Sequence, residues 1–219
     1  MNTKAVIFDM DGVMVDNNVF HKKAWLDFCD QHHFKLTDAE LEQYVYGRTN
    51  TAILNYLYKN SLNLQEISDF EEEKESLYRK LYLPYFQEVA GLTAFLKKLK
   101  NANFKLAIAT SAYRKNIDYV LDELPIRDLF DVIVDSSFVT EGKPNPQIYL
   151  KTAELLGINP KNCLVVEDSL SGVESGLRAD MKVLGVSTTH TAEELSNTSL
   201  VIPNFENVGV EEVNGILEM

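Results

Sequence analysis

Six short apolar runs, separated by helical patterns, constrain the fold of this chain more than any other feature. The runs are residues 5–8, 106–109, 132–134, 164–166, 183–186 and 200–202. Near-continuous apolar runs of this length are typical of strands that are buried on both faces of a parallel sheet. Helical patterns lie between the runs, for example at residues 92–99 and 148–156. The alternation predicts an α/β fold with a doubly wound parallel sheet.

One long stretch interrupts this alternation. Residues 17–85 have no strand pattern, but they carry amphipathic helix patterns at 21–28, 38–46, 51–58 and 65–81. Thr37 and Glu40 have the spacing of a capping box at the start of the second of these helices. We therefore expect a helical cap domain at residues 17–85, inserted into an α/β core domain formed by residues 1–16 and 86–219.

The charge balance narrows the class of partner. The 219 residues include 21 Lys and Arg against 33 Asp and Glu, which gives a net charge of −12. This acidity disfavours nucleic acid and anionic membranes as partners, so an anionic substrate would need a local cation. Cys29 and Cys163 form no disulfide or zinc pattern, and no signal-peptide or membrane-spanning pattern is present. We expect a cytoplasmic protein.

Residues with catalytic chemistry follow the expected strands. In open α/β sheets ligands bind beyond the carboxyl ends of the strands, where such residues converge. The set comprises Asp9, Asp11, Thr110, Ser111, Lys143, Glu167 and Asp168. Clustered carboxylates repel one another unless a hard cation such as Mg²⁺ lies among them. An ionised aspartate can attack a phosphate ester when the metal and a lysine offset the charge, and a second carboxylic group can transfer the protons.

At these positions the chain resembles the haloacid dehalogenase superfamily of phosphotransferases, in particular its β-phosphoglucomutase-like branch with a helical cap. Four signature segments of the superfamily occur in order. They are D-x-D-G at 9–12, the strand-end hydroxyl of Thr110, K-P-x-P at 143–146 and E-D-S-x-x-G at 167–172. Each motif alone is weak, whereas four in order at strand ends form a specific pattern.

The resemblance implies roles for the carboxylates. Asp9 would be the nucleophile and a Mg²⁺ ligand. Asp11 would be the general acid and base, with its backbone carbonyl on the metal. Asp168 would be a metal ligand, with Glu167 in or near the inner coordination shell.

The resemblance also implies how the transferring phosphoryl group is held. Thr110 and Lys143 would contact and neutralise it, assisted by the backbone amides of Ser111 and Ala112 at a helix entry. Taken alone, Thr110 also fits a hydroxyl that caps a turn, and Lys143 fits an exposed loop lysine.

Substrate contacts in the cap rest on weaker patterns. His21 and Trp25 have the spacing of a His-x-x-x-Trp pair in the sugar mutase, and Lys74 occupies the place of another cap lysine. Gly47 and Arg48 fall in the specificity loop of this branch, where an arginine could hold a non-transferring phosphate. Simpler interpretations remain: Trp25 fits the cap core, and the charged residues fit a solvated helix surface.

Departures from the mutase pattern leave the substrate open. Asn50 replaces the mutase's phosphate-binding arginine, Ala-Tyr-Arg at 112–114 replaces its Ser-Lys-Asn, and Asp-Asn at 16–17 replaces its Asp-Thr. We expect a monomeric, Mg²⁺-dependent phosphatase or phosphomutase for a small phosphorylated metabolite such as a sugar phosphate. The alternatives are an inorganic pyrophosphatase and a non-enzymatic phospho-aspartate module of the receiver type, which would need no cap. A nucleotide-binding domain is disfavoured because no glycine-rich phosphate loop is present.

Overall fold

The computed structural model describes residues 3–45 and 48–219. The chain divides into two compact units. The core unit comprises the chain up to Asp16 together with Gln87–Met219, and the helical unit comprises Asn17–Phe86.

The core unit contains a sheet of six parallel strands, as the apolar runs predict. The strands are β1 (Ala5–Phe8), β2 (Lys105–Ala109), β3 (Val132–Val134), β4 (Cys163–Glu167), β5 (Lys182–Val186) and β6 (Leu200–Ile202). Their order across the sheet is β3-β2-β1-β4-β5-β6, and every neighbouring pair is parallel. The expected doubly wound fold is therefore confirmed, and each apolar run became a strand.

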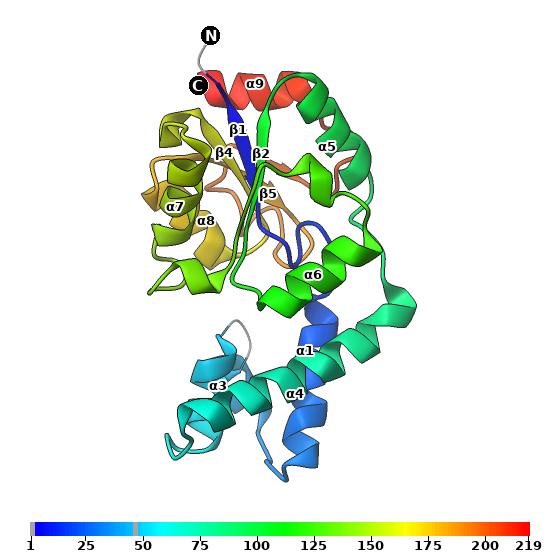
Figure 1. Ribbon diagram of the computed structural model, residues 1–219, viewed down its shortest axis with the longest axis vertical. Helices are drawn as coiled ribbons and strands as arrows, with labels where there is room; N and C mark the ends of the chain where they lie inside the picture. The colour runs from blue at the N-terminus through cyan, green and yellow to red at the C-terminus, as the bar shows by residue number, and fades with distance from the viewer. Residues whose placement is uncertain (1–2, 46–47) are drawn as a thin grey trace. The chain divides into compact units, whose positions relative to one another are not determined.

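Helices cover both faces of this sheet (Figure 1). They are α5 (Leu92–Asn101), α6 (Arg114–Glu123), α7 (Gln147–Leu156), α8 (Leu170–Arg178) and α9 (Val210–Glu218). On one face, Ile7 of β1 lies in an apolar cluster with Ile148 of α7 and Val173 of α8. On the other face, Phe8 packs edge-on against Phe95 of α5, with ring centroids 6.2 Å apart. Successive residues of β1 thus enter opposite cores, which is why the strand is apolar throughout.

The strand order reverses direction at the centre of the sheet. After β1 the chain forms β2 and β3 on one side, and it then crosses to form β4, β5 and β6 on the other. Phe8 at the end of β1 is in register with Ile108 of β2 and with Val166 of β4. The residues that follow these three strands consequently meet at one edge, at the kind of switch point where α/β folds bind ligands.

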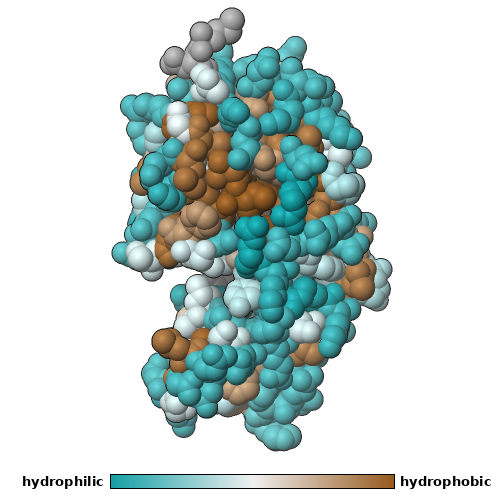
Figure 2. All heavy atoms as spheres, in the orientation of Figure 1, coloured by the Kyte–Doolittle hydropathy of each residue, from teal (hydrophilic) through white to brown (hydrophobic). Residues whose placement is uncertain are grey.

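The helical unit consists of α1 (Asn18–Gln31), α2 (Asp38–Tyr44), α3 (Asn50–Leu57) and α4 (Leu64–Tyr82). The capping box expected at the start of α2 is present: the Thr37 amide donates to Glu40 Oε2 at 2.8 Å, and the Glu40 amide donates to Thr37 Oγ1 at 3.3 Å. Residue 46, the expected end of α2, lies outside the described residues. Figure 2 shows mostly hydrophilic residues on the visible face of this unit and an apolar area on the core unit. Within the described ranges, no helix has the length and apolar character needed to cross a membrane.

Candidate active site

The strand register brings the first and fourth sequence motifs together. Asp9 follows β1, and its backbone amide donates to the Val166 carbonyl of β4 at 3.0 Å. Glu167 ends β4, and Asp168 follows it. Asp9, Glu167 and Asp168 are all buried. The two acidic motifs, about 160 residues apart in the sequence, therefore form one cluster at the sheet edge.

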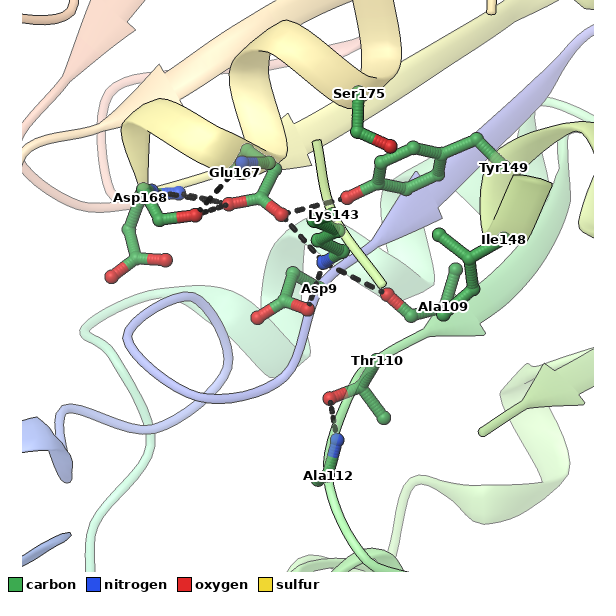
Figure 3. Close-up of polar contacts among 12 residues, drawn as sticks. Asp9, Ala109, Thr110, Ala112, Lys143, Ile148, Tyr149, Glu167, Asp168 and Ser175 are labelled. Atoms are coloured by element: carbon green, nitrogen blue, oxygen red, sulfur yellow. Dashed lines mark hydrogen bonds and ion pairs between the residues drawn. The ribbon is translucent and has the colours of Figure 1, made fainter. Parts of the chain in front are cut away.

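Lys143 joins this cluster from the loop that precedes α7 (Figure 3). Its ammonium donates to Asp9 Oδ1 at 2.5 Å and to Glu167 Oε1 at 2.6 Å. The carbonyl of Ala109, at the end of β2, lies 3.5 Å from the same nitrogen. The lysine side chain is only 8% exposed, so it is a buried counter-ion and not an exposed loop lysine.

Glu167 accepts hydrogen bonds on both carboxylate oxygens. Oε1 accepts from Lys143 and from the hydroxyl of Tyr149, the latter at 2.8 Å. Oε2 accepts from the amides of Asp168 and Ser169 and from the Ser169 hydroxyl, at 3.0 to 3.1 Å. These five donors occupy a carboxylate that the family resemblance implies to be in or near the inner metal shell. Its contacts fit an anchor for Lys143 better than a metal ligand.

The close approach of Glu167 accounts for the glycine of the fourth motif, Gly172. A β-carbon at this position in the first turn of α8 would overlap the carboxyl group of Glu167. Ser169 caps the same helix by accepting from the Gly172 amide at 3.0 Å. The segment 167–172 is thus built so that α8 closes directly over the buried carboxylate.

The electrostatics of the cluster follow from burial and from the excess of acids over bases. Burial raises the pKa of Asp9 to about 7, although Lys143 opposes the shift. Burial and the charges of Glu167 and Asp9 hold the pKa of Asp168 well above its usual range. Burial is the strongest single influence on Glu167 and acts to raise its pKa, but Lys143, together with the hydrogen bonds from Ser169 and Tyr149, lowers the pKa of that carboxyl. Without a metal, the cluster therefore has one ammonium for three carboxyl groups, too little positive charge to balance them all.

A divalent cation fits this deficit. Asp9, Glu167 and Asp168 each offer one oxygen, and these oxygens lie within 4.8 Å of one another. Hard cations such as Mg²⁺ prefer carboxylate oxygens. Because Glu167 is already held by protein donors, Asp9 and Asp168 are the carboxylates whose contacts suit a metal better.

Two threonines in the loop after β5 contact the first and fourth motifs, and neither was among the residues predicted from the sequence. The Thr188 hydroxyl donates to the Gly12 carbonyl at 2.5 Å, within the turn that carries Asp11. The Thr189 hydroxyl donates to Asp168 Oδ2. Both residues follow the carboxyl end of an expected strand, so the rule that identified Thr110 also applies to them.

Asp11 and Gly12 lie in a tight turn after β1. The Gly12 amide donates to the Val15 carbonyl at 2.8 Å, and Gly12 has a positive φ of 77°. A left-handed backbone of this kind favours glycine, which accounts for the G of D-x-D-G. Asp11 is half-buried, and its charge contributes to the raised pKa of Asp9.

Thr110 follows β2 and is 1% exposed. Its hydroxyl oxygen accepts from the Ala112 amide at 3.0 Å, which is a local turn contact. Ser111 is exposed beside it. Thr110 therefore caps the turn before α6, and the same turn lies at the sheet edge that bears Asp9.

The predicted cap residues are held mainly by one another. Lys74 is 2% exposed, and its ammonium lies 2.9 Å from His21 Nδ1 and 2.9 Å from Glu75 Oε1. Trp25 is 4% exposed in the apolar core of the helical unit, and its ring lies 5.4 Å from the Lys74 ammonium. Lys74 is thus a buried, paired charge and not part of a solvated surface, and Trp25 is a core residue of this unit.

The specificity loop is only partly described. Gly47 lies outside the described residues. Arg48 is exposed, and its Nε donates to the Gln43 carbonyl at 3.3 Å. Asn50, which replaces the mutase's arginine, donates to Glu75 Oε1 at 2.7 Å. The described part of this loop therefore carries one exposed arginine and an amide that is bound to a buried acid.

The chain is similar to known proteins over most of its length. The family model described as haloacid dehalogenase-like hydrolase matches residues 6–186. The β-phosphoglucomutase of Bacillus subtilis is 30% identical, with 84% of this chain and 83% of that protein covered. Hexitol phosphatase A of Escherichia coli is 28% identical, with 98% of each covered.

Solved structures of related proteins have the same fold as this chain. A β-phosphoglucomutase from Clostridium difficile superposes with a TM-score of 0.84 at 28% identity, covering 99% of this chain and 97% of that one. A family IA hydrolase from Entamoeba histolytica gives a TM-score of 0.88 at 28% identity, covering 99% and 100%. The chain therefore belongs to the haloacid dehalogenase-like hydrolases, enzymes of the phosphatase and phosphomutase type, and resembles their β-phosphoglucomutase-like branch.

Proposed function

We propose that this protein is a Mg²⁺-dependent phosphatase for a small phosphorylated metabolite and that it acts through an aspartyl-phosphate on Asp9. The observation that carries the proposal is the ion pair between the Lys143 ammonium and Asp9 Oδ1 at 2.5 Å, within a cluster of buried carboxylates. A carboxylate held beside a buried ammonium can approach an anionic phosphate because the lysine offsets the charge.

In the first step an oxygen of Asp9 attacks phosphorus, and the bond from phosphorus to the leaving oxygen breaks. Asp11 donates a proton to that oxygen, so the product leaves as an alcohol. Lys143 offsets the charge of the phosphoryl group. The Ala112 amide already donates to the Thr110 hydroxyl, so the Ser111 amide is the one in this turn that we assign to the phosphoryl group. Asp9 and Asp168 would hold Mg²⁺, which would supply further positive charge beside the phosphoryl group.

In the second step water attacks phosphorus, and Asp11 accepts the proton of the water. The bond from phosphorus to Asp9 breaks, which regenerates the carboxylate and releases inorganic phosphate. Glu167 holds Lys143 in place throughout, because its two oxygens are fixed by five donors.

The relatives support a phosphorylated sugar or sugar alcohol as the substrate. They include a hexitol phosphatase, a β-phosphoglucomutase and a phosphatase of phosphorylated carbohydrates from Thermotoga maritima, the last 30% identical. A cap that carries Arg48 on an exposed loop suits a polar, anionic substrate.

A panel of substrates tests the proposal. Phosphate release is measured with Mg²⁺ from sugar phosphates, hexitol phosphates, nucleotides, phosphonates and pyrophosphate. We expect turnover of carbohydrate phosphates by the parent protein and loss of turnover in Asp9→Asn, whose side chain is nearly isosteric. Activity of Asp9→Asn equal to that of the parent would refute the assignment of Asp9 as the nucleophile. A preference for pyrophosphate over carbohydrate phosphates would identify an inorganic pyrophosphatase instead.

A phosphomutase is the second candidate, favoured by the similarity to β-phosphoglucomutases. In a mutase a second hydroxyl of the substrate, and not water, accepts the phosphoryl group from Asp9. β-Glucose 1-phosphate with a bisphosphate primer separates the two. Glucose 6-phosphate without free phosphate would identify a mutase, whereas stoichiometric phosphate release would exclude it.

A further inference from the structure

Tyr149 contacts the Lys143–Glu167 pair from α7, and none of the sequence motifs includes it. Its side chain is fully buried, with 0% of the residue exposed. The hydroxyl donates to Glu167 Oε1 at 2.8 Å, the same oxygen that accepts from Lys143 at 2.6 Å. The Lys143 ammonium also lies 5.1 Å from the centroid of the tyrosine ring. Figure 3 shows the phenol directed at this carboxylate.

Lys143 is shared between two carboxylates. Its nitrogen lies 2.5 Å from Asp9 Oδ1 and 2.6 Å from Glu167 Oε1, so the two acids compete for one ammonium. A carboxylate oxygen that gains a second donor attracts the first less strongly, because the negative charge on that oxygen is partly compensated. The tyrosine hydroxyl supplies this second donor on the Glu167 side only.

We propose that Tyr149 is a positioning residue that acts through Glu167 to keep the Lys143 ammonium directed at Asp9. The hydroxyl partly compensates the negative charge on Glu167 Oε1, and the ring lies 5.1 Å from the ammonium. Without the hydroxyl, Lys143 moves towards Glu167 and away from the position where a phosphoryl group on Asp9 needs it. This inference rests on the proposed function for its effect on turnover, although the position of Lys143 can be measured without any substrate.

Tyr149→Phe isolates the hydroxyl, because it keeps the ring and its volume. Thr152→Val is the matched control: Thr152 lies on the same helix, is 0% exposed, and its hydroxyl donates only to the Ile148 carbonyl at 2.8 Å among the described contacts. Both variants remove one buried hydroxyl of α7 with little change of shape. Thermal unfolding of both establishes that each is folded.

Two readouts are compared in the parent and both variants. The first is the ¹H–¹⁵N signal of the Lys143 ammonium, assigned with Lys143→Met, in the metal-free protein. The second is kcat and KM for 4-nitrophenyl phosphate with Mg²⁺. We expect Tyr149→Phe to shift the ammonium signal and to lower kcat about tenfold while KM changes less than about twofold, and Thr152→Val to alter neither.

The outcomes separate this inference from the proposed function. An unshifted ammonium signal in Tyr149→Phe, or the same shift in Thr152→Val, would overturn the positioning role. A shifted signal with unchanged kcat would also overturn it, since the moved lysine would then not matter to catalysis. A parent protein that hydrolyses no phosphate ester would refute the proposed function. The ¹H–¹⁵N signal of Lys143 would still show whether Tyr149 affects the position of the ammonium.

Discussion

Lowering the pH from 8 to 6 should weaken Mg²⁺ binding by the protein at least tenfold. A metal ligand must be deprotonated, and burial raises the pKa of Asp9 to about 7 in the metal-free protein. With that pKa, about one Asp9 in eleven is ionised at pH 6 and about ten in eleven at pH 8, a ratio of about ten. The raised pKa of Asp168 acts in the same direction, so tenfold is a lower limit.

Isothermal titration calorimetry with Mg²⁺ measures this effect. Titrations in two buffers of different ionisation enthalpy also count protons, and we expect about one or more released per metal at pH 6. Asp9→Asn should reduce the pH dependence. Asp131→Asn is the control and should leave the pH dependence of Mg²⁺ binding unchanged. Asp131 precedes β3, outside the cluster. Burial opposes the shift, but partners that include Lys105 and Lys100 lower its pKa to about 2, so Asp131 does not titrate between pH 6 and pH 8. Equal affinity at pH 6 and pH 8 would refute the reasoning.

Three further changes test separate parts of the structure. Gly172→Ala forces Glu167 out of its position, so we expect a loss of about 2–4 kcal/mol in the free energy of unfolding, measured with urea, together with loss of turnover. Thr189→Val removes the hydroxyl donor to Asp168, and calorimetry should show about tenfold weaker Mg²⁺ binding. Leu54→Ala opens a cavity in the core of the helical unit, where Leu54 is 0% exposed, and should cost about 3 kcal/mol in unfolding free energy. A change below about 1 kcal/mol for Gly172→Ala or Leu54→Ala, or unaltered binding for Thr189→Val, would contradict the corresponding contact.

The sheet was predictable from the sequence because both of its faces are buried. Ile7 and Phe8 enter different cores, so no polar residue interrupts β1, and the other runs follow the same rule. The strand-end rule then located Asp9, Thr110 and Glu167 correctly at one edge, because parallel strands in register end together.

The finer contacts were not readable from the sequence. Tyr149 reaches Glu167 only because α7 presents that side chain to the sheet edge, which depends on how the helix packs. Lys74 fits a solvated helix pattern, yet it is buried because Glu75 and His21 supply its partners. Thr189 could have been found, since it follows a predicted strand and carries a hydroxyl as Thr110 does.

The central claim is that Asp9 carries the phosphoryl group during turnover. The most direct measurement is mass spectrometry of the Asp11→Asn variant. This variant lacks the general base, so hydrolysis of the intermediate is slowed. It is incubated with a good substrate from the panel, and the reaction is stopped with acid before the protein is digested. The account predicts one added phosphoryl group on the peptide that contains Asp9, and none in the Asp9→Asn, Asp11→Asn double variant. Label on another residue, or the same label in the double variant, would contradict it.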